Sequence, residues 1–405
     1  ALKVNNRLTE NGEKHMKIVV LGGTGLTGRC AVRDLAGSPE VSEVVMTSRS
    51  LEKAQRIADE IKSKKVSIAQ LDVTKHDDTV KVLRDADVAL NAVQYYYNLD
   101  VMRAALEAKV HYLDLGGLFH VAQKQLKLND KFREAGLTAI LGIGECPGIT
   151  NVMARYAVDR LDSVETILIR DTWMDFTEGA PPFMVTWSLS TLFDEMTVPA
   201  MIFENGQYKE APPLSGKETM TFPEPFGSQD QYYTIHSEPA TFPASFKNKG
   251  IKNVNWKEGG PGFLDIKIFV DAGLASEEPL SIKETEVSPR QFFLKLLASQ
   301  NLMGCPEGVT PDDWEVTRII AIGKKDGNKV SRTMDSIFRS RAEWRATSSE
   351  VAVGVPSSIA AQMLAKGDIK VKGAIPPENC IDPEPFLDEL AKRDIKILET
   401  IRKNV

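Results

Sequence analysis

A glycine-rich turn separates the first predicted strand of the chain from the first predicted helix. It reads Leu21-Gly22-Gly23-Thr24-Gly25-Leu26-Thr27-Gly28 and contains GxGxxG at Gly23, Gly25 and Gly28. In such a turn the first glycine permits a tight bend, the second lets a pyrophosphate approach the backbone, and the third lets the helix pack on the strand. Amides at the helix N-terminus then point at the phosphates. Residues Gly23 to Gly28 therefore predict a dinucleotide-binding site.

The end of the second predicted strand indicates which dinucleotide binds. Ser48 and Arg49 stand where NAD-binding proteins usually place an acidic residue for the ribose 2′-hydroxyl. A hydroxyl and a guanidinium can instead bind a 2′-phosphate, so NADP is favoured and NAD is the alternative. Arg49 capping the strand or stacking on the adenine is the other interpretation. Asp72 is expected to contact the adenine amino group, and Asn91 to border the nicotinamide ribose.

Asp114 ends the fifth predicted strand and is followed by paired glycines. A carboxylate at the carboxyl end of a central parallel strand lies beside the ligand crevice, where it could attract a cationic group or act as a base. The alternative is that Asp114 caps the next helix. We predict a catalytic role for Asp114.

The elements that position these residues alternate short apolar strands with helical segments from Met16 onward. Continuous apolar strands between helices predict a parallel sheet covered on both faces, the α/β Rossmann architecture. The predicted strands are 17–21, 43–48, 66–73, 87–93, 110–115 and 138–143.

The pattern changes after Gly148, which predicts a second domain. Residues 151–162 are expected to form a helix, 164–173 a strand, and 263–272 a strand of an antiparallel sheet. Residues 355–369 and 383–397 read as amphipathic helices. The expected domains are a Rossmann domain of 16–148 and 346–405 and an inserted α+β substrate-binding and dimerisation domain of 149–345; residues 1–15 are expected to be a disordered extension or tag remnant.

Composition excludes several classes of function. Apolar residues make up 42% and charged residues 26% of the 405 residues, and the net charge of −6 argues against nucleic-acid binding. No stretch is apolar for long enough to predict a membrane span. The four scattered cysteines and five scattered histidines predict reduced thiols in a cytoplasmic protein and no metal site.

The order and spacing of several segments resemble the saccharopine dehydrogenase-like oxidoreductases from Met16 to about Ile397. The segments are GGTGLTG, TSRSLEKAQ, NAVQYYYNLDVMRAALEAKVHYLDLGG, GIGECPGITNV and PPENCIDPEPFLDEL. The resemblance implies an NAD(P)-dependent dehydrogenase acting on CH–NH or CH–NH2 donors, with an amino-acid-like substrate and a homodimer through the inserted sheet. It also implies a catalytic role for Tyr95, which matches a family tyrosine.

Three further residues are expected to bind the substrate. Glu145 and Cys146 lie where the chain leaves the first domain, and Cys146 replaces an aspartate that many relatives carry. His236 belongs to the inserted domain, where it is expected to bind substrate with Ser237 and Glu238, although a lone histidine is more often structural.

The substrate is left open between alternatives. Saccharopine-binding relatives have an arginine shortly after a Trp-Ser pair, whereas Trp187-Ser188 is followed here by Leu189 and Ser190. This departure weighs against saccharopine and favours a lysine-like or carboxynorspermidine-type polyamine substrate. Relatives that oxidise lysine at C6 tend to have an acidic residue at the end of the second strand, which this chain lacks. An NADP-binding sensor without turnover is the alternative to an enzyme.

Overall fold

The computed structural model describes residues 15–181, 183 and 186–403, which belong to two compact units. The first unit comprises Ala1–Tyr156 and Ala352–Asp394, and the second comprises Ala157–Val351 and Ile395–Val405. The units differ from the expected domains at their edges, since the last residues of the chain belong to the second unit. Residues 1–15 were expected to be a disordered extension or tag remnant. Except for His15, these residues lie outside the described part of the chain.

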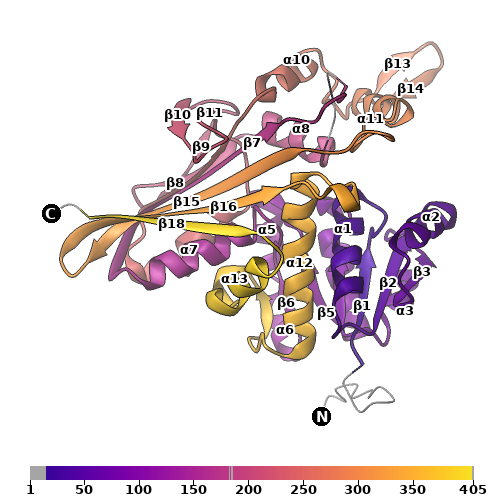
Figure 1. Ribbon diagram of the computed structural model, residues 1–405, viewed down its shortest axis with the longest axis horizontal. Coiled ribbons are helices and arrows are strands. Elements are labelled where there is room, and N and C mark those ends of the chain that lie inside the picture. The colour runs from indigo at the N-terminus through magenta and orange to yellow at the C-terminus, as the bar shows by residue number, and fades with distance from the viewer. Residues whose placement is uncertain (1–14, 182, 184–185, 404–405) are drawn as a thin grey trace. The chain divides into compact units, whose positions relative to one another are not determined.

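The first unit is built on a parallel sheet, as predicted (Figure 1). The strand order is β17-β6-β5-β4-β1-β2-β3, and every neighbouring pair is parallel. The strands are β1 Lys17–Leu21, β2 Glu43–Ser48, β3 Val66–Gln70, β4 Val88–Asn91, β5 His111–Asp114, β6 Thr138–Ile140 and β17 Gly373–Ile375. The order reverses at β1, which is the switch point where Rossmann sheets bind dinucleotides.

Both faces of this sheet are buried, which explains why its strands are apolar without alternation. Val19 and Leu21 belong to a core cluster with α3 and α4, whereas Ile18 and Val20 are buried on the opposite face. Helix α12 lies close to α1, because a Cβ at Gly354 would meet the Thr27 carbonyl at 2.8 Å. The helices of this unit are α1 Leu26–Gly37, α2 Leu51–Ile61, α3 His76–Leu83, η1 Tyr95–Tyr97, α4 Asn98–Ala108, α5 Leu118–Leu126, α6 Asn129–Glu134, η5 Pro377–Asn379 and α13 Pro383–Ala391.

Two helices cross from one unit to the other. These are α7 Ile149–Asp159 and α12 Ser348–Lys366, close to the predicted helices at 151–162 and 355–369. The predicted helix at 383–397 is too long at its C-terminal end. Helix α13 stops at Ala391, and the chain then extends into β18.

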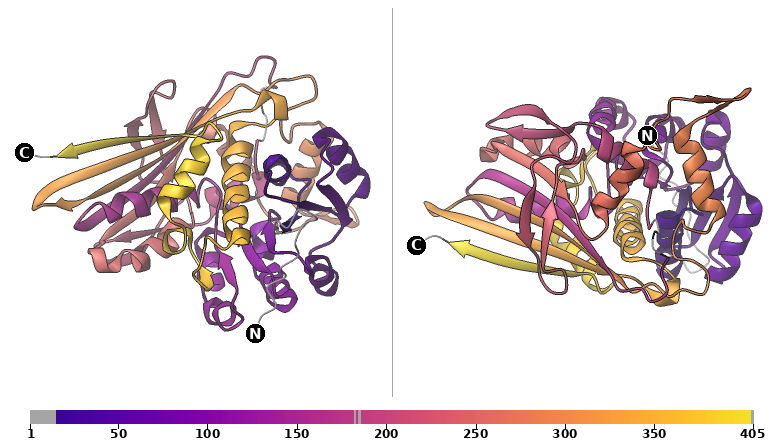
Figure 2. Two further views of the ribbon diagram at one scale, coloured as in Figure 1. Left: turned by 60° about the horizontal axis from the view of Figure 1, so that its bottom comes forward. Right: turned by 90° about the horizontal axis from the view of Figure 1, so that it is seen from above.

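The second unit contains a seven-stranded mixed sheet with the order β18-β16-β15-β7-β12-β8-β9. All its pairs are antiparallel except β7 with β12. The long strands β15, β16 and β18 lie side by side in both views of Figure 2. The strands are β7 Ser163–Asp175, β8 Ala200–Glu204, β9 Gln207–Ala211, β12 Asn253–Glu258, β15 Asp313–Lys325, β16 Asn328–Arg339 and β18 Lys396–Lys403.

Two hairpins and several short helices complete the second unit. The hairpins are β10 Glu218–Thr221 with β11 Ser228–Gln231, and β13 Leu280–Ile282 with β14 Thr285–Val287. The helices are α8 Leu189–Thr197, α9 Glu238–Ser245, η2 Lys247–Lys249, η3 Phe263–Asp265, α10 Ile266–Asp271, α11 Pro289–Ser299 and η4 Ala342–Trp344.

The predicted strand at 263–272 is wrong, because this segment forms η3 and α10. Phe263, Ile266, Phe269 and Val270 belong to one apolar cluster that also contains residues of α8. Their spacing of three and four residues places them on one side of a helix. The short apolar run at 263–272 was compatible with a helix or a strand, and packing against α8 favours the helix.

The central strands of the second unit carry opposite charges on their two faces. Arg170 pairs in register with Lys257 and Arg318, whereas the next residue, Asp171, pairs with Glu258 and Thr317. Successive residues of a strand point to opposite faces, so the basic row and the acidic row lie on different sides of the sheet.

The basic row is neutralised by local carboxylates. Glu218 accepts hydrogen bonds from Arg170 Nε at 2.5 Å and from Lys257 Nζ at 2.6 Å. Arg318 Nε donates to Asp335 Oδ1 at 2.6 Å. These pairs lower the pKa of Glu218 despite its partial burial. Among the described residues, no lysine or arginine forms an ion pair with Asp171 or Glu258 of the acidic row, which makes it the unusual side of the sheet.

No helix among the described residues is long and apolar enough to cross a membrane.

Candidate active site

The glycine-rich turn has the geometry that a pyrophosphate requires. A Cβ on Gly28 would lie 2.4 Å from the Gly22 carbonyl oxygen, so α1 can pack on the turn only with glycine there. A Cβ on Gly23 would meet the side chain of Met46 at 2.6 Å, whereas Gly25 faces open space apart from the Gly22 carbonyl at 3.2 Å. The tight bend itself is made by Gly22, which has φ +72° and lies just before the predicted motif.

The N-terminus of α1 is available to an anion. The helix begins at Leu26 with Gly25 as its N-cap; no side chain caps it, and its first turn contains no acidic residue. Its free amides and the helix dipole therefore favour phosphate at this end. The Thr24 and Ser48 hydroxyls lie 3.0 Å apart and tie the turn to the end of β2.

A group of cations surrounds the end of β2. Partial burial, followed by the positive charges of Arg29, Arg56 and Arg49, lowers the pKa of Lys53 at the start of α2. Arg49 itself is exposed and forms no ion pair with a described carboxylate. Like charges held together in this way fit a phosphate ligand, which would relieve their repulsion.

Asp72 and Asn91 differ in how far they are available to a cofactor. Asp72 is exposed after β3, where it accepts hydrogen bonds from the amide and hydroxyl of Thr74. Asn91 is fully buried at the end of β4, and its Nδ2 donates to Asn98 Oδ1 and to the Tyr112 hydroxyl. The Nδ2 of Asn91 therefore supports the loop, whereas its Oδ1 is buried without a hydrogen-bond partner among the described residues and remains, with the backbone, for the predicted cofactor contact.

Asp114 is the centre of a buried network at the carboxyl ends of the strands. Its carboxylate accepts four hydrogen bonds, from the Tyr112 hydroxyl at 2.9 Å, Gln125 Nε2 at 2.5 Å, the Gly116 amide at 3.0 Å and the Gly142 amide at 2.8 Å. Burial raises the pKa of Asp114, and these hydrogen bonds oppose the rise. The network joins the loops after β5 and β6.

These contacts favour a positioning role for Asp114. The side chain is fully buried, so no oxygen of Asp114 is open to a ligand. Its hydrogen bonds also differ from a helix cap, because α5 begins at Leu118 with Gly117 as its N-cap. The catalytic role stays a prediction.

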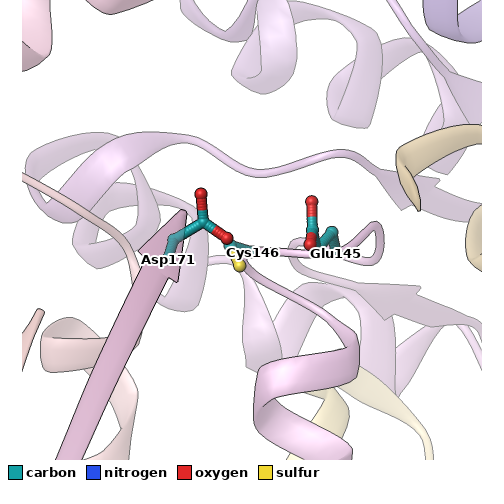
Figure 3. Close-up of side chains that lie close together, drawn as sticks. All are labelled: Glu145, Cys146 and Asp171. Atoms are coloured by element: carbon teal, nitrogen blue, oxygen red, sulfur yellow. The ribbon is translucent and has the colours of Figure 1, made fainter. Parts of the chain in front are cut away.

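The remaining sequence-predicted residues of the first unit lie in two loops. Tyr95 opens η1 after β4 and is partly exposed, with its ring edge-to-face against Tyr96 at 5.6 Å. Glu145 and Cys146 lie on the loop between β6 and α7, whereas Asp171 lies on β7 (Figure 3). Glu145 is buried, and its carbonyl accepts the Thr150 amide at 3.1 Å.

The second unit buries a group of acidic side chains, which we call the carboxylate cluster. Three of its members share one face of the sheet, and two come from α8 and α9. The members are Asp171, Glu195, Glu238, Glu258 and Glu315, and none is more than 8% exposed. Buried carboxylates are rare unless they are paired with cations or bind a ligand.

The members of the carboxylate cluster repel one another. Burial raises the pKa of Asp171 well above its ordinary value, and Glu315, Glu258 and Glu238 contribute further, against a hydrogen bond from Thr317 at 2.7 Å. Burial likewise raises the pKa of Glu195, with contributions from Glu258, Asp171 and other carboxylates. The pKa of Glu258 is also raised.

Hydrogen bonding in the cluster is incomplete. Glu195 is 2% exposed, yet its Oε2 has no hydrogen-bond partner among the described residues, and the same is true of the Ser237 hydroxyl. A buried polar atom without a partner costs free energy, so these two atoms lower the stability of the unit as it stands.

His236 is the sequence-predicted residue that the structure places in this cluster. Its Nδ1 is hydrogen-bonded to Glu238, and its ring stacks on Trp256 with a centroid distance of 3.9 Å and an angle of 13°. Burial raises the pKa of the neighbouring Glu258, and the positive charge that His236 can carry opposes this rise.

Most of the cluster was missed by sequence reasoning. The available signal was a pair of neighbouring opposite charges in each of two strands, Arg170-Asp171 within β7 and Lys257-Glu258 at the end of β12. Such pairs place one charge on each face of a sheet, but their partners Glu195 and Glu315 are distant in sequence and became neighbours only through folding.

The fold and the phosphate-binding turn define a dinucleotide-binding protein of the Rossmann class. Residues 18–140 match the family model of the saccharopine dehydrogenase NADP-binding domain, and residues 144–395 match that of the saccharopine dehydrogenase C-terminal domain. The chain therefore belongs to the saccharopine dehydrogenase family, as the sequence predicted. It is an NAD(P)-dependent dehydrogenase.

Individual relatives match over nearly the whole chain. Carboxynorspermidine synthase of Vibrio alginolyticus is 26% identical over 404 residues, covering 93% of this chain and 94% of that protein. Carboxyaminopropylagmatine dehydrogenase of Synechocystis sp. is also 26% identical over 404 residues, covering 95% and 98%. The structure of apo saccharopine dehydrogenase (L-Glu forming) from Saccharomyces cerevisiae shares the fold, with a TM-score of 0.70 at 19% identity, covering 96% and 100%.

Asp114→Asn should distinguish positioning from proton transfer. The carboxylate of Asp114 accepts hydrogen bonds from four donors. An amide has only one acceptor oxygen, and its N–H group would face donors that now bond to the carboxylate. We expect unfolding to become easier by about 2–3 kcal/mol, and dinucleotide affinity and turnover to fall together. Denaturant unfolding and NADPH titration measure these quantities. Loss of turnover with unchanged stability and affinity would instead support a catalytic role.

Proposed function

We propose that this protein is an NADP-preferring oxidoreductase acting on a CH–NH bond of a polyamine-like substrate that also carries a carboxylate. The carboxylate cluster of the second unit is the observation that supports this proposal. A substrate with several ammonium groups would pair with the buried carboxylates and supply the hydrogen-bond donors that Glu195 and Ser237 lack.

The charge of the cluster discriminates among the substrates that the sequence left open. Saccharopine carries more carboxylates than ammonium groups, so an anionic site would repel it. Carboxylated polyamines carry more ammonium groups than carboxylates. Free lysine carries fewer ammonium groups than a carboxylated polyamine does. The absence of an arginine after Trp187-Ser188, where Ser188 instead caps α8, also weighs against saccharopine.

The full-length relatives support the same choice. Both the Vibrio and the Synechocystis proteins are named for carboxylated polyamines or a related guanidine compound. In the mechanism we propose, Gly23–Gly28 bind the pyrophosphate and the carboxylate cluster binds and orients the ammonium groups. The nicotinamide, when bound, supplies or accepts the hydride. Asp114 keeps the loops after β5 and β6 in place, and Tyr95 with Glu145 and Cys146 are retained as candidate substrate contacts.

A substrate panel followed by the absorbance of reduced nicotinamide tests the function. Carboxynorspermidine and carboxyaminopropylagmatine should be oxidised with NADP, whereas saccharopine and lysine should give little or no turnover. Glu195→Gln should raise KM for the polyamine about ten- to hundredfold, because one charge-assisted hydrogen bond is lost. The matched control Glu204→Gln changes an exposed residue of β8 and should leave KM unchanged.

Two results would contradict the proposal. Turnover of saccharopine in preference to polyamines would reject the substrate class, and an unchanged KM in Glu195→Gln would reject the cluster as the binding site. Tight NADP binding without turnover of any panel member would support the sensor alternative.

The preference for NADP is tested at Arg49. Arg49→Glu should weaken NADP binding by roughly 1–3 kcal/mol and NAD binding much less, because only NADP has the phosphate that the guanidinium would contact. Calorimetric titration with both dinucleotides measures the difference. Lys124→Glu, an exposed position on α5, makes the same change of net charge and should affect neither. Equal losses for NADP and NAD in Arg49→Glu would reject the assignment.

We also propose that the chain is a cytoplasmic homodimer that associates through the sheet of the second unit. None of the four cysteines forms a disulfide bond, in keeping with a reducing compartment. Strand β18 is an edge strand on which Leu398 and Ile401 are each 45% exposed, and an open apolar edge favours pairing with another chain. Light scattering should give the mass of two chains, and Leu398→Lys should give the mass of one. A wild-type mass of one chain would reject the dimer.

A further inference from the structure

His236 is held in one orientation within the carboxylate cluster. Its Nδ1 is hydrogen-bonded to the carboxylate of Glu238 at the start of α9, and its ring lies flat on the indole of Trp256 from β12. The indole is fixed in turn, because Trp256 Nε1 donates to the Thr234 hydroxyl at 2.9 Å. With Nδ1 engaged by a carboxylate, the lone pair of the neutral ring is on Nε2, which has no hydrogen-bond partner among the described residues.

Oxidation of an amine requires a deprotonated nitrogen, whereas neighbouring carboxylates favour the protonated ammonium form. Hydride can leave the carbon only when the neighbouring nitrogen has lost a proton and has a free lone pair. Carboxylates around an ammonium group stabilise its protonated form, so the cluster that binds the substrate also disfavours the reactive form. A neutral base within the cluster is needed to remove that proton.

We infer that His236 is this base, an inference that rests on the proposed polyamine substrate. In the oxidative direction, Nε2 of His236 accepts one proton from the substrate's secondary ammonium group. The freed lone pair of the nitrogen would then form the C=N bond of an iminium product, with the nicotinamide, when bound, as the acceptor of the hydride from the neighbouring carbon. In reduction, the imidazolium returns its proton to the amine that is formed.

The surroundings of His236 favour this transfer. Glu238 on α9 is hydrogen-bonded to His236, and the charge of His236 acts on Glu258 on β12. Asp171 on β7 and Glu195 on α8 interact electrostatically with both of these carboxylates, and Glu315 on β15 interacts with Asp171. Moving a proton from an ammonium to the imidazole leaves the total charge among them unchanged. The carboxylates that held the ammonium then stabilise the imidazolium, so the transfer does not require a new buried charge.

Trp256 acts as a positioning residue in this arrangement. Its indole fixes the plane of the imidazole, and together with Glu238 it determines where Nε2 points. Removing the indole should therefore loosen the base without removing it, whereas changing His236 removes the base itself.

His236→Asn tests the inference, because an amide can still donate to Glu238 but cannot accept a proton from an ammonium group. We expect kcat for oxidation of a carboxylated polyamine to fall about 100-fold, with little change in KM or NADPH affinity. In the wild type, kcat should fall as the pH is lowered, because an imidazolium cannot accept a proton. This decline should be absent in His236→Asn, while titration of the carboxylates continues to affect KM.

Two further variants serve as controls. Trp256→Phe keeps an aromatic ring beneath the imidazole and should lower kcat less while retaining the decline at low pH. His236→Ala leaves space for a small base, so free imidazole in the assay should restore part of its kcat. Thermal unfolding and NADPH binding establish that each variant is folded.

The outcomes separate this inference from the proposed function. Wild-type turnover of polyamines with an unchanged kcat and pH profile in folded His236→Asn would overturn the role of His236 and leave the polyamine function intact. Absence of polyamine turnover by the wild type would overturn both. Loss of kcat together with a large rise in KM and no rescue by imidazole would assign His236 to substrate binding and overturn its role as the base.

Discussion

Repulsion among buried carboxylates is the constraint on which the second unit depends. Asp171, Glu195 and Glu258 all have raised pKa values because burial and neighbouring negative charges disfavour their ionised forms. A sheet whose only task was stability would place apolar residues at these positions, since burying like charges lowers the stability of the fold. The arrangement is understandable when a polycation enters the site, because the ligand then supplies the opposite charge and the missing hydrogen-bond donors.

The geometry of β-strands makes this arrangement possible without loss of the fold. Arg170 and Asp171 are adjacent in sequence but point to opposite faces, so the sheet keeps its acidic row apart from its basic row. The basic side is completed within the unit by Glu218, which bonds both Arg170 and Lys257. The acidic side has no such completion by lysine or arginine among the described residues, and it is the side that we propose binds the substrate.

The first unit solves a different problem, the binding of an anion. Glycine at position 28 allows α1 to approach the turn, and the uncapped N-terminus of α1 directs its amides at a phosphate. Asp114 stabilises the same end of the sheet, because its carboxylate bonds the Gly116 and Gly142 amides in the loops after β5 and β6. In the function that we propose, the two units thus present opposite charges to two kinds of ligand, positive groups to the dinucleotide and negative groups to the amine.

The sequence alone determined the parallel sheet and its phosphate-binding turn, because both depend on local patterns: apolar runs such as 17–21 and glycines at fixed spacing after them. It also indicated His236 with its sequence neighbours Ser237 and Glu238, but not the stacking on Trp256. Only the tertiary structure decided the helix at residues 266–271 and the return of residues 396–403 to the second unit, since both result from packing between segments distant in sequence. The same holds for the carboxylate cluster. Glu195 and Glu315 are ordinary charged residues in the sequence, and folding alone removes them from water and places them beside Asp171.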